Sequence, residues 1–213
     1  MPKSSSSYLC WLLGLCLGAG YLNVSTVLEF TLTSSHLTGH LSHLAVQLAA
    51  GNILLAFKFL FVLGSFYLGG CLSGLLNPKR RPENQRSVKV VLGIILALIA
   101  LRALGCLPPV SQAYAISFAL GMQNSLALFY QGLIIRTTHY TGTITDFSVA
   151  TAQALSGQPS ARARLAVLGS SILIFILGGL LASWLVAFPL IYVGFPLILY
   201  LVLWATSALM SWA

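Results

Sequence analysis

The sequence predicts an all-α integral membrane protein with six spanning helices, two shorter half-helices and two inverted structural repeats. Of the 213 residues, 58% are hydrophobic and only 7% are charged, whereas about 25% are charged in a typical soluble domain. Long apolar runs recur along the whole chain, and short motifs of its first half reappear in the same order in its second half. The mean hydropathy is +0.92, so residues 1–213 are expected to form a single membrane domain.

Six apolar runs have the length of about 20 residues that a helix needs to cross a hydrocarbon core of about 30 Å. They cover residues 8–31, 53–76, 88–105, 110–134, 165–186 and 190–210. The first run resembles a signal peptide. Its apolar character continues to Phe30, however, and it takes part in the internal repeat, so we interpret it as a retained helix.

Two shorter segments, residues 41–50 and 143–155, each follow a Thr-Gly step. Both are too short or too polar for a comfortable lipid-facing span, since one contains His43 and the other Asp146. We interpret them as half-helices packed inside the bundle. Glycine allows the chain to turn and to approach a ligand closely, and the threonine hydroxyl can cap free N–H groups.

Internal repetition is the strongest pattern in the sequence, and repeated motifs indicate that a fold is built from copies of one structural unit. The repeated motifs are Gly20-x-x-Asn23 with Gly121-x-x-Asn124, His36-x-Thr38-Gly39 with His139-x-Thr141-Gly142, and Leu68-Gly69-Gly70 with Leu177-Gly178-Gly179, at offsets of 101, 103 and 109. They predict two copies of one unit, at residues 8–107 and 110–212. Each copy would hold one span, one Thr-Gly half-helix and two further spans.

The distribution of basic residues predicts how the two copies are related. If the half-helices crossed the membrane, the copies would be parallel, with five of the eleven basic residues inside and six outside. If the half-helices turn back, the copies are inverted, and nine basic residues lie inside, leaving only Lys58 and Arg102 outside. Only the second arrangement follows the positive-inside rule. It predicts cytoplasmic N- and C-termini.

Inverted repeats with interrupted helices typically bind a substrate near the membrane midplane, between the two copies. Two half-helix N-termini pointing inward would favour an anion or a polar solute, and histidines beside them could donate hydrogen bonds or carry a coupled proton. Ionisable residues within a membrane are functional candidates. The predicted lining of the substrate site is Asn23, Glu29, His36, Thr38, Gly39, His40, Asn124, His139, Thr141, Gly142 and Asp146. We therefore expect a small transporter-like or channel-like protein.

Several alternatives remain. The asparagines could simply bond neighbouring helices, and the histidines could lie at the headgroup level, in a non-transporting scaffold or helper subunit. His36, His40 and His43 have a spacing that would share one helix face, which leaves open a metal transporter. An intramembrane enzyme is disfavoured because the sequence has no recognised catalytic motif.

Partners follow from the same composition. The net charge of +8 is clustered in loops, so it indicates topology and contact with lipid headgroups and not binding to nucleic acid. No cofactor is expected, because the four cysteines lie in apolar surroundings without metal-ligand spacing. The formation of homo-oligomers is left open.

Three segments, from both halves of the chain, resemble a known family. The segment GMQNSLALFYQGLIIRTTHYTGTITDFS, residues 121–148, together with GYLNVSTVLEF and HLTGHLSHLAVQLA in the first half, is similar to the YoaK-like family of bacterial inner-membrane proteins of unknown function. The resemblance covers nearly the whole chain and implies a multi-pass protein of the bacterial inner membrane with about six spans. This chain has Asn23 where the family commonly has an acidic residue, and His40 where it commonly has asparagine. The resemblance supplies no substrate.

Overall fold

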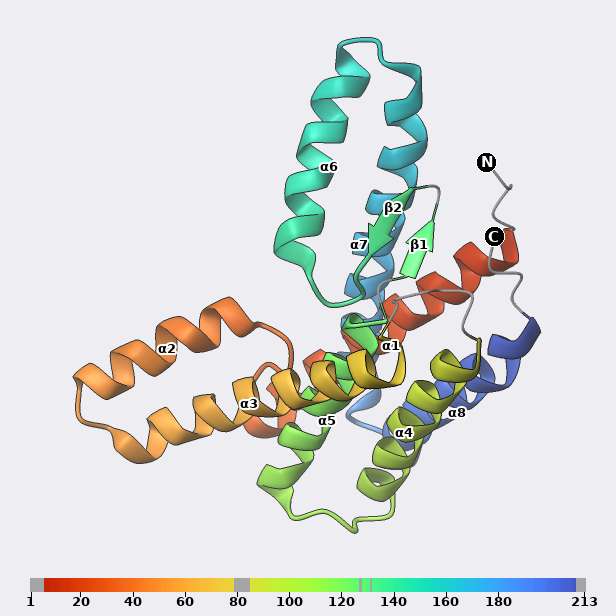
Figure 1. Cartoon of the computed structure of the whole chain (residues 1–213). Helices are drawn as coiled ribbons and strands as arrows, with labels where there is room; N and C mark the ends of the chain where they lie inside the picture. The colour runs from red at the N-terminus through yellow and green to blue at the C-terminus, as the bar shows by residue number, and fades with distance from the viewer. Residues whose placement is uncertain (1–5, 79–84, 127, 131, 210–213) are drawn as a thin grey trace.

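A computed structural model gives the structure of the chain, shown in Figure 1, and describes residues 6–78, 85–126, 128–130 and 132–209. The described residues are mostly helical, as expected. The helices are α1 (Ser6–Phe30), α2 (Leu37–Ala49), α3 (Ile53–Leu76), α4 (Gln85–Ala103), α5 (Pro109–Asn124), α6 (Tyr140–Leu155), α7 (Pro159–Leu185) and α8 (Pro189–Thr206), followed by a short 3-10 turn, Ser207–Leu209. Lys3, Lys79, Arg80 and Arg81, which the charge count assigns to the cytoplasmic side, lie outside the described residues.

The helices pair mainly across the two halves of the sequence. α1 packs most extensively against α7, and α3 packs most extensively against α5. Two helical hairpins project from this centre: Figure 1 shows α2 and α3 extending to one side and α6 and α7 extending upward. α4 and α8 pack against each other. If α5 to α8 are taken as the counterparts of α1 to α4, the α1–α7 pair corresponds to the α5–α3 pair, and the α2–α3 hairpin corresponds to the α6–α7 hairpin. The α4–α8 pair corresponds to itself.

The two central helix pairs depend on glycines from the repeated motifs. A Cβ built on Gly20 would lie 2.0 Å from the Phe175 carbonyl oxygen, and one built on Gly178 would lie 2.1 Å from that of Leu17. In the other pair, a Cβ on Gly69 would lie 2.0 Å from the Phe118 oxygen. Real Cβ atoms do not approach oxygen so closely, so only glycine allows these backbones to meet.

A second glycine contact completes the α3–α5 pair. A Cβ on Gly121 would lie 2.1 Å from the carbonyl oxygen of Phe66. Gly20 thus contacts Phe175 and Gly121 contacts Phe66. These two phenylalanines are separated by 109 positions. The same offset separates the two Leu-Gly-Gly motifs. The motif pairs therefore hold matching positions in the two helix contacts.

The core lies around α1, α4 and α5. Leu15, Leu92 and Leu120 are among its fully buried side chains. In contrast, the only buried side chain of α2 is His40 and the only one of α6 is Ala150. Large apolar side chains are exposed along α3, α7 and α8, which is the pattern of helix faces that contact lipid.

Among the described residues, four helices, α1, α3, α7 and α8, are long and apolar enough to cross a membrane. This finding fits the expectation of an integral membrane protein. α4 falls outside the group because it carries Arg86, Lys89 and Arg102, and α5 has only 16 residues. Six spans therefore stay a prediction.

The fourth apolar run, residues 110–134, does not form one helix as the sequence analysis expected. α5 ends at Asn124 and is followed by an antiparallel hairpin of β1 (Leu128–Tyr130) and β2 (Leu133–Ile135). The two strands are rich in β-branched and aromatic residues, which favour strands. Gly132 supplies a φ of +79°, which suits the tight turn of a two-residue hairpin loop. An apolar run alone cannot distinguish such a hairpin from a helix.

Candidate functional site

Both half-helices begin a few residues earlier than the sequence predicts, so each Thr-Gly step lies in the first turn of its helix and not at the break. α2 begins at Leu37 and α6 at Tyr140, each one residue before the threonine of its Thr-Gly step. The preceding residues have similar non-helical backbones, with φ/ψ of −87°/66° at His36 and −95°/61° at His139. The chain thus enters the two helices in the same way. The break lies immediately before each Thr-Gly step.

The glycine of each step makes room for the histidine that precedes the helix. A Cβ on Gly39 would lie 2.1 Å from Cδ2 of His36, and a Cβ on Gly142 would lie 2.8 Å from Cε1 of His139. Each imidazole ring therefore folds over the first turn of its own helix. Neither His36 nor His139 caps its helix through a side-chain hydrogen bond, so first-turn N–H groups are left without that partner.

The predicted capping by threonine is not seen. Among the described residues, the hydroxyls of Thr38 and Thr141 make no hydrogen bond, although the Thr141 carbonyl accepts one from Thr145 Oγ1 at 3.0 Å. Both threonine side chains are exposed. They are therefore available to a ligand and do not serve as caps.

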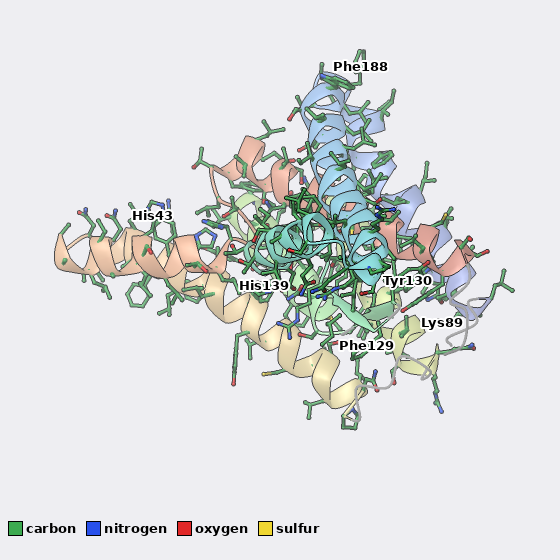
Figure 2. All side chains as sticks on the ribbon, turned by 90° about the horizontal axis from the view of Figure 1, so that it is seen from above. His43, Lys89, Phe129, Tyr130, His139 and Phe188 are labelled. Atoms are coloured by element: carbon green, nitrogen blue, oxygen red, sulfur yellow. The ribbon has the colours of Figure 1, made fainter. Side chains whose placement is uncertain are left out.

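A cavity of about 330 Å³ lies where the two half-helices begin. It is lined by Asn23, Thr33, Ser35, His36, Leu37, Thr38, Phe66, Asn124, Thr138, His139, Tyr140, Thr141 and Phe175. Residues from both halves contribute in matching pairs, such as Asn23 with Asn124 and His36 with His139. Figure 2 shows His139 near the centre of the molecule, whereas His43 lies out on the projecting α2 arm.

Most of the predicted site residues meet at this cavity. The six that line it are Asn23, His36, Thr38, Asn124, His139 and Thr141. Gly39 and Gly142 lie directly beneath the two imidazole rings. Three predicted residues, Glu29, His40 and Asp146, do not line the cavity.

Glu29 belongs to a separate polar cluster. Its carboxylate forms an ion pair with Arg102 and accepts a hydrogen bond from the Tyr192 hydroxyl at 2.6 Å. Arg102 also donates to Ser25 Oγ at 3.3 Å. A carboxylate bound by a guanidinium and a phenol in this way joins the ends of α1 and α4 to the start of α8.

His40 and Asp146 both lie away from the cavity lining, His40 in a buried position and Asp146 at the surface. The His40 ring is buried, bonds through Nε2 to Thr33 Oγ1 at 3.0 Å and to the Thr33 carbonyl, and packs on Phe59. Asp146 is exposed on α6 and makes no ion pair among the described residues. These positions favour a structural role for His40 and a surface position for Asp146.

The histidine spacing does not produce a metal site. His43 stacks on Phe59 with ring centroids 5.1 Å apart, and His36 lies before the helix and turns over Gly39. No group of three or more histidine, cysteine or acidic residues in the described part of the chain could hold a metal ion. His36, His40 and His43 therefore lie in three different environments and do not point to a common centre.

The two cavity asparagines differ in their partners. Asn23 Oδ1 accepts hydrogen bonds from the Ser35 backbone N–H at 3.0 Å and from Ser35 Oγ at 2.9 Å. Asn124 Oδ1 is buried and has no hydrogen-bond partner among the described residues. An unpaired buried acceptor is unusual in a folded protein.

Comparison with known families identifies the chain. Residues 11–209 match a family described as "Protein of unknown function (DUF1275)". The chain belongs to the DUF1275 family. No curated protein and no solved structure is significantly similar to it. The resemblance to the YoaK-like family is consistent with DUF1275 membership and is not confirmed by it.

The cavity of this DUF1275 chain is lined mostly by polar residues but carries little charge. Apart from its two histidines, its described lining contains no ionisable side chain other than Tyr140. The first residues of α2 and α6 line it, and a helix N-terminus carries partial positive charge. The cavity can therefore donate hydrogen bonds from backbone, amide and imidazole groups to a small solute.

Some of the lining residues were missed in the sequence analysis. The missed side chains are Thr33, Ser35, Leu37, Phe66, Thr138, Tyr140 and Phe175. The offset of 109 between Phe66 and Phe175 equals that of the neighbouring Leu-Gly-Gly motifs, and the offset of 103 between Ser35 and Thr138 equals that of the histidine motifs. Extending each motif by a few residues would have found these four.

Proposed function

We propose that this protein is a small secondary-transporter-like or channel-like membrane protein that moves a small polar or anionic solute. The single observation that carries the proposal is the cavity of about 330 Å³ lined by matching residues of both halves. Sites between two related halves, at the ends of interrupted helices, are typical of secondary transporters. A scaffold would need no such cavity.

An inverted arrangement of two repeats, residues 8–107 and 110–212, forms part of the proposal. It is supported by the equivalent helix pairs α1–α7 and α5–α3, and by the matching glycine contacts within them. The six spans would be α1, α3, α4, α5, α7 and α8. α2 has 13 residues and α6 has 16, and at 1.5 Å per residue the shorter of the two cannot cross a core of about 30 Å.

Charge placement supports the same topology. Lys89 lies 4.7 Å over the Trp204 ring, and Trp11 Nε1 donates to the Leu203 carbonyl at 2.9 Å, so the starts of α1 and α4 share one end with the end of α8. The Glu29–Arg102–Tyr192 cluster joins the opposite ends of the same three helices. Basic residues near the first end would be cytoplasmic, in the inner membrane of a bacterium, under the positive-inside rule.

The nature of the solute follows from the lining. Uncapped first-turn N–H groups, two amides and two imidazoles favour a solute with hydrogen-bond acceptors, such as a small carboxylate, an inorganic anion or a neutral carbonyl compound. Phe66 and Phe175 would contact its apolar part. The cavity holds at most a molecule of modest size.

A thermal-stability screen tests the proposal. The purified protein would be heated with formate, acetate, phosphate, urea or glycerol, at pH 5.5 and 7.5, beside the His139→Ala and His43→Ala variants. A ligand at 100-fold its Kd stabilises the folded state by about 2.7 kcal/mol. We expect at least one solute to raise the Tm of the wild type and of His43→Ala but not of His139→Ala, because His139 lines the cavity and His43 does not.

The solute that passes this screen would then be tested for flux in proteoliposomes. Flux that is lost in His139→Ala and retained in His43→Ala would support transport. If no solute raises the Tm, and His139→Ala is merely less stable, the proposal fails. The scaffold alternative, in which the histidines only hold helices together, then becomes the better explanation.

A further inference from the structure

We propose that Asn23 and Asn124 anchor their neighbouring loops alternately, so that one asparagine holds its loop in each of two conformations of the cavity. The first loop is residues 31–36, between α1 and α2, and the second loop is residues 136–139, between β2 and α6. The inference rests on the proposed function, because it names the residues that would switch the proposed site between its two states.

The first loop is held by Asn23 in this structure. Both the backbone N–H and the hydroxyl of Ser35 donate to Asn23 Oδ1, at 3.0 and 2.9 Å. Asn23 lies on α1, three residues after the glycine that contacts α7. The bond therefore couples the wall of the cavity to the α1–α7 contact.

The second loop lacks the equivalent bond. Asn124 stands 101 residues after Asn23, and Thr138 stands 103 residues after Ser35, as in the repeated motifs. Both line the same cavity, and Thr138 has the same pair of donors as Ser35, a backbone N–H and a hydroxyl. Asn124 Oδ1 nevertheless has no partner among the described residues, although it is buried. Thr138 and Asn124 thus line one cavity, and the donors of Thr138 do not bond the unpaired Asn124 Oδ1.

In each loop, the residue before Ser35 or Thr138 is held in place by hydrogen bonds to the helices. In the first loop Ser34 donates to Thr26 Oγ1 at 2.7 Å and accepts at its carbonyl from Ser117 Oγ at 2.9 Å. In the second loop the equivalent residue, Thr137, accepts from Gln123 Nε2 at 2.7 Å. Ser34 and Thr137 are each 1% exposed. Only the following residue, Ser35 or Thr138, would have to change partner.

Alternation keeps the two conformations close in free energy. A conformation in which Thr138 bonds Asn124 while Ser35 leaves Asn23 would again contain one satisfied and one unsatisfied asparagine. The penalty for an unpaired buried acceptor is therefore present in both conformations and cancels between them. Two states of similar free energy are what a solute needs in order to shift the population from one to the other.

Disulfide trapping tests, without any solute, whether the two loops approach their helices in alternation, and the hydrogen-exchange experiment below tests the role of the asparagines themselves. The four native cysteines are replaced, and two cysteine pairs are introduced into one chain, Asn23→Cys with Ser35→Cys and Asn124→Cys with Thr138→Cys. After mild oxidation, N-ethylmaleimide labels the remaining thiols, and intact mass with peptide mapping counts the bridges. We expect each bridge to form in some molecules, and molecules with both bridges to be at least about tenfold rarer than the product of the two yields.

A matched control shows that two bridges can form in one chain. Asn52 Nδ2 donates to Gln47 Oε1 at 2.9 Å in the turn between α2 and α3, away from the cavity. Gln47→Cys with Asn52→Cys should bridge independently of the 23–35 pair. Doubly bridged molecules at the product of the yields, or a 124–138 pair that never bridges, would overturn the inference. Neither result would alter the outcome of the thermal-stability screen, so the two proposals fail separately.

Hydrogen exchange provides a second readout in case the cysteine variants fold poorly. Asn23→Ala removes the anchor of the first loop, so exchange should become faster at Ser35 and slower at Thr138. Asn124→Ala should do the opposite and slow exchange at Ser35 by severalfold. If Asn23→Ala leaves exchange at Thr138 unchanged and Asn124→Ala leaves exchange at Ser35 unchanged, or if either substitution accelerates both loops, the alternation is wrong.

Discussion

Gly20 lies against the carbonyl group of Phe175 so closely that a Cβ on the glycine would be 2.0 Å from that oxygen. The contact joins α1 to α7, whose packing is the most extensive between helices in the described structure. Gly20→Ala must force the two backbones apart. We expect a loss of about 1–3 kcal/mol, the usual cost of overpacking, measured by unfolding in denaturing detergent.

Gly64→Ala is the matched control for Gly20→Ala. Gly64 also lies inside a helix, α3, but nothing lies within 4 Å of its Cβ position. Because alanine is the better helix former by about 1 kcal/mol, the substitution should leave stability unchanged or raise it slightly. Equal losses from the two variants would mean that the α1–α7 contact is not as close as the structure has it.

Removal of Arg102 should destabilise the protein more than removal of an exposed charge. Arg102→Met leaves the Glu29 carboxylate without its cation, while the Tyr192 hydroxyl still donates to it. We expect a loss of about 1–3 kcal/mol, as for other polar groups that lose a partner. The double variant with Glu29→Gln should be less destabilised than the sum of the two single variants. Asp146→Asn, on the exposed face of α6, should have no measurable effect.

A buried hydrogen bond between two helices provides another test. Tyr200 Oη donates to Gln123 Oε1 at 2.6 Å, and Gln123 Nε2 donates to Thr137 Oγ1 and to the Leu15 carbonyl. Tyr200→Phe leaves the glutamine oxygen unpaired in the core, so the Tm should fall, with a loss of about 1–3 kcal/mol. Tyr67→Phe, at a tyrosine that is 68% exposed, should leave the Tm unchanged. A fall of equal size in both variants would contradict this role of Gln123.

Gly39→Ala should displace the His36 ring without unfolding the protein. The new methyl group would meet the end of a flexible side chain, 2.1 Å from Cδ2 of His36, and the ring can rotate away. With four histidines in the chain, their ring signals can be assigned by NMR. The His36 signals should move strongly and those of His43 should stay. Unmoved His36 signals would mean that the ring does not lie over Gly39.

The sequence predicts much of this architecture because its signals are local. A Thr-Gly step marks the start of each half-helix, and small residues mark close helix contacts. Both are readable within a few positions, and the two Thr-Gly steps do lie in the first turns of α2 and α6. The ends of α3 were likewise predicted by its apolar run, 53–76.

The remaining features depend on contacts between distant segments. Glu29 was expected at the cavity, but Arg102, 73 residues away, and Tyr192 hold it elsewhere. The hairpin after Asn124 was missed because an apolar run has the same composition in a strand and in a helix. The difference between Asn23 and Asn124 was also invisible, since the two motifs are alike and only their loops differ.

The cross-pairing of the halves has a consequence for biosynthesis. Trp11, near the start of α1, bonds the Leu203 carbonyl across 192 residues, and α1 finds its main partner in α7. The first half therefore cannot complete its packing when it leaves the ribosome. The glycine-lined faces of α1 and α3 remain without their partners in the bilayer until the second half is inserted. Each hairpin, α2–α3 and α6–α7, can instead form as soon as it is synthesised. The two halves are thus one folding unit, and a gene cut between them would yield two fragments that fold only together.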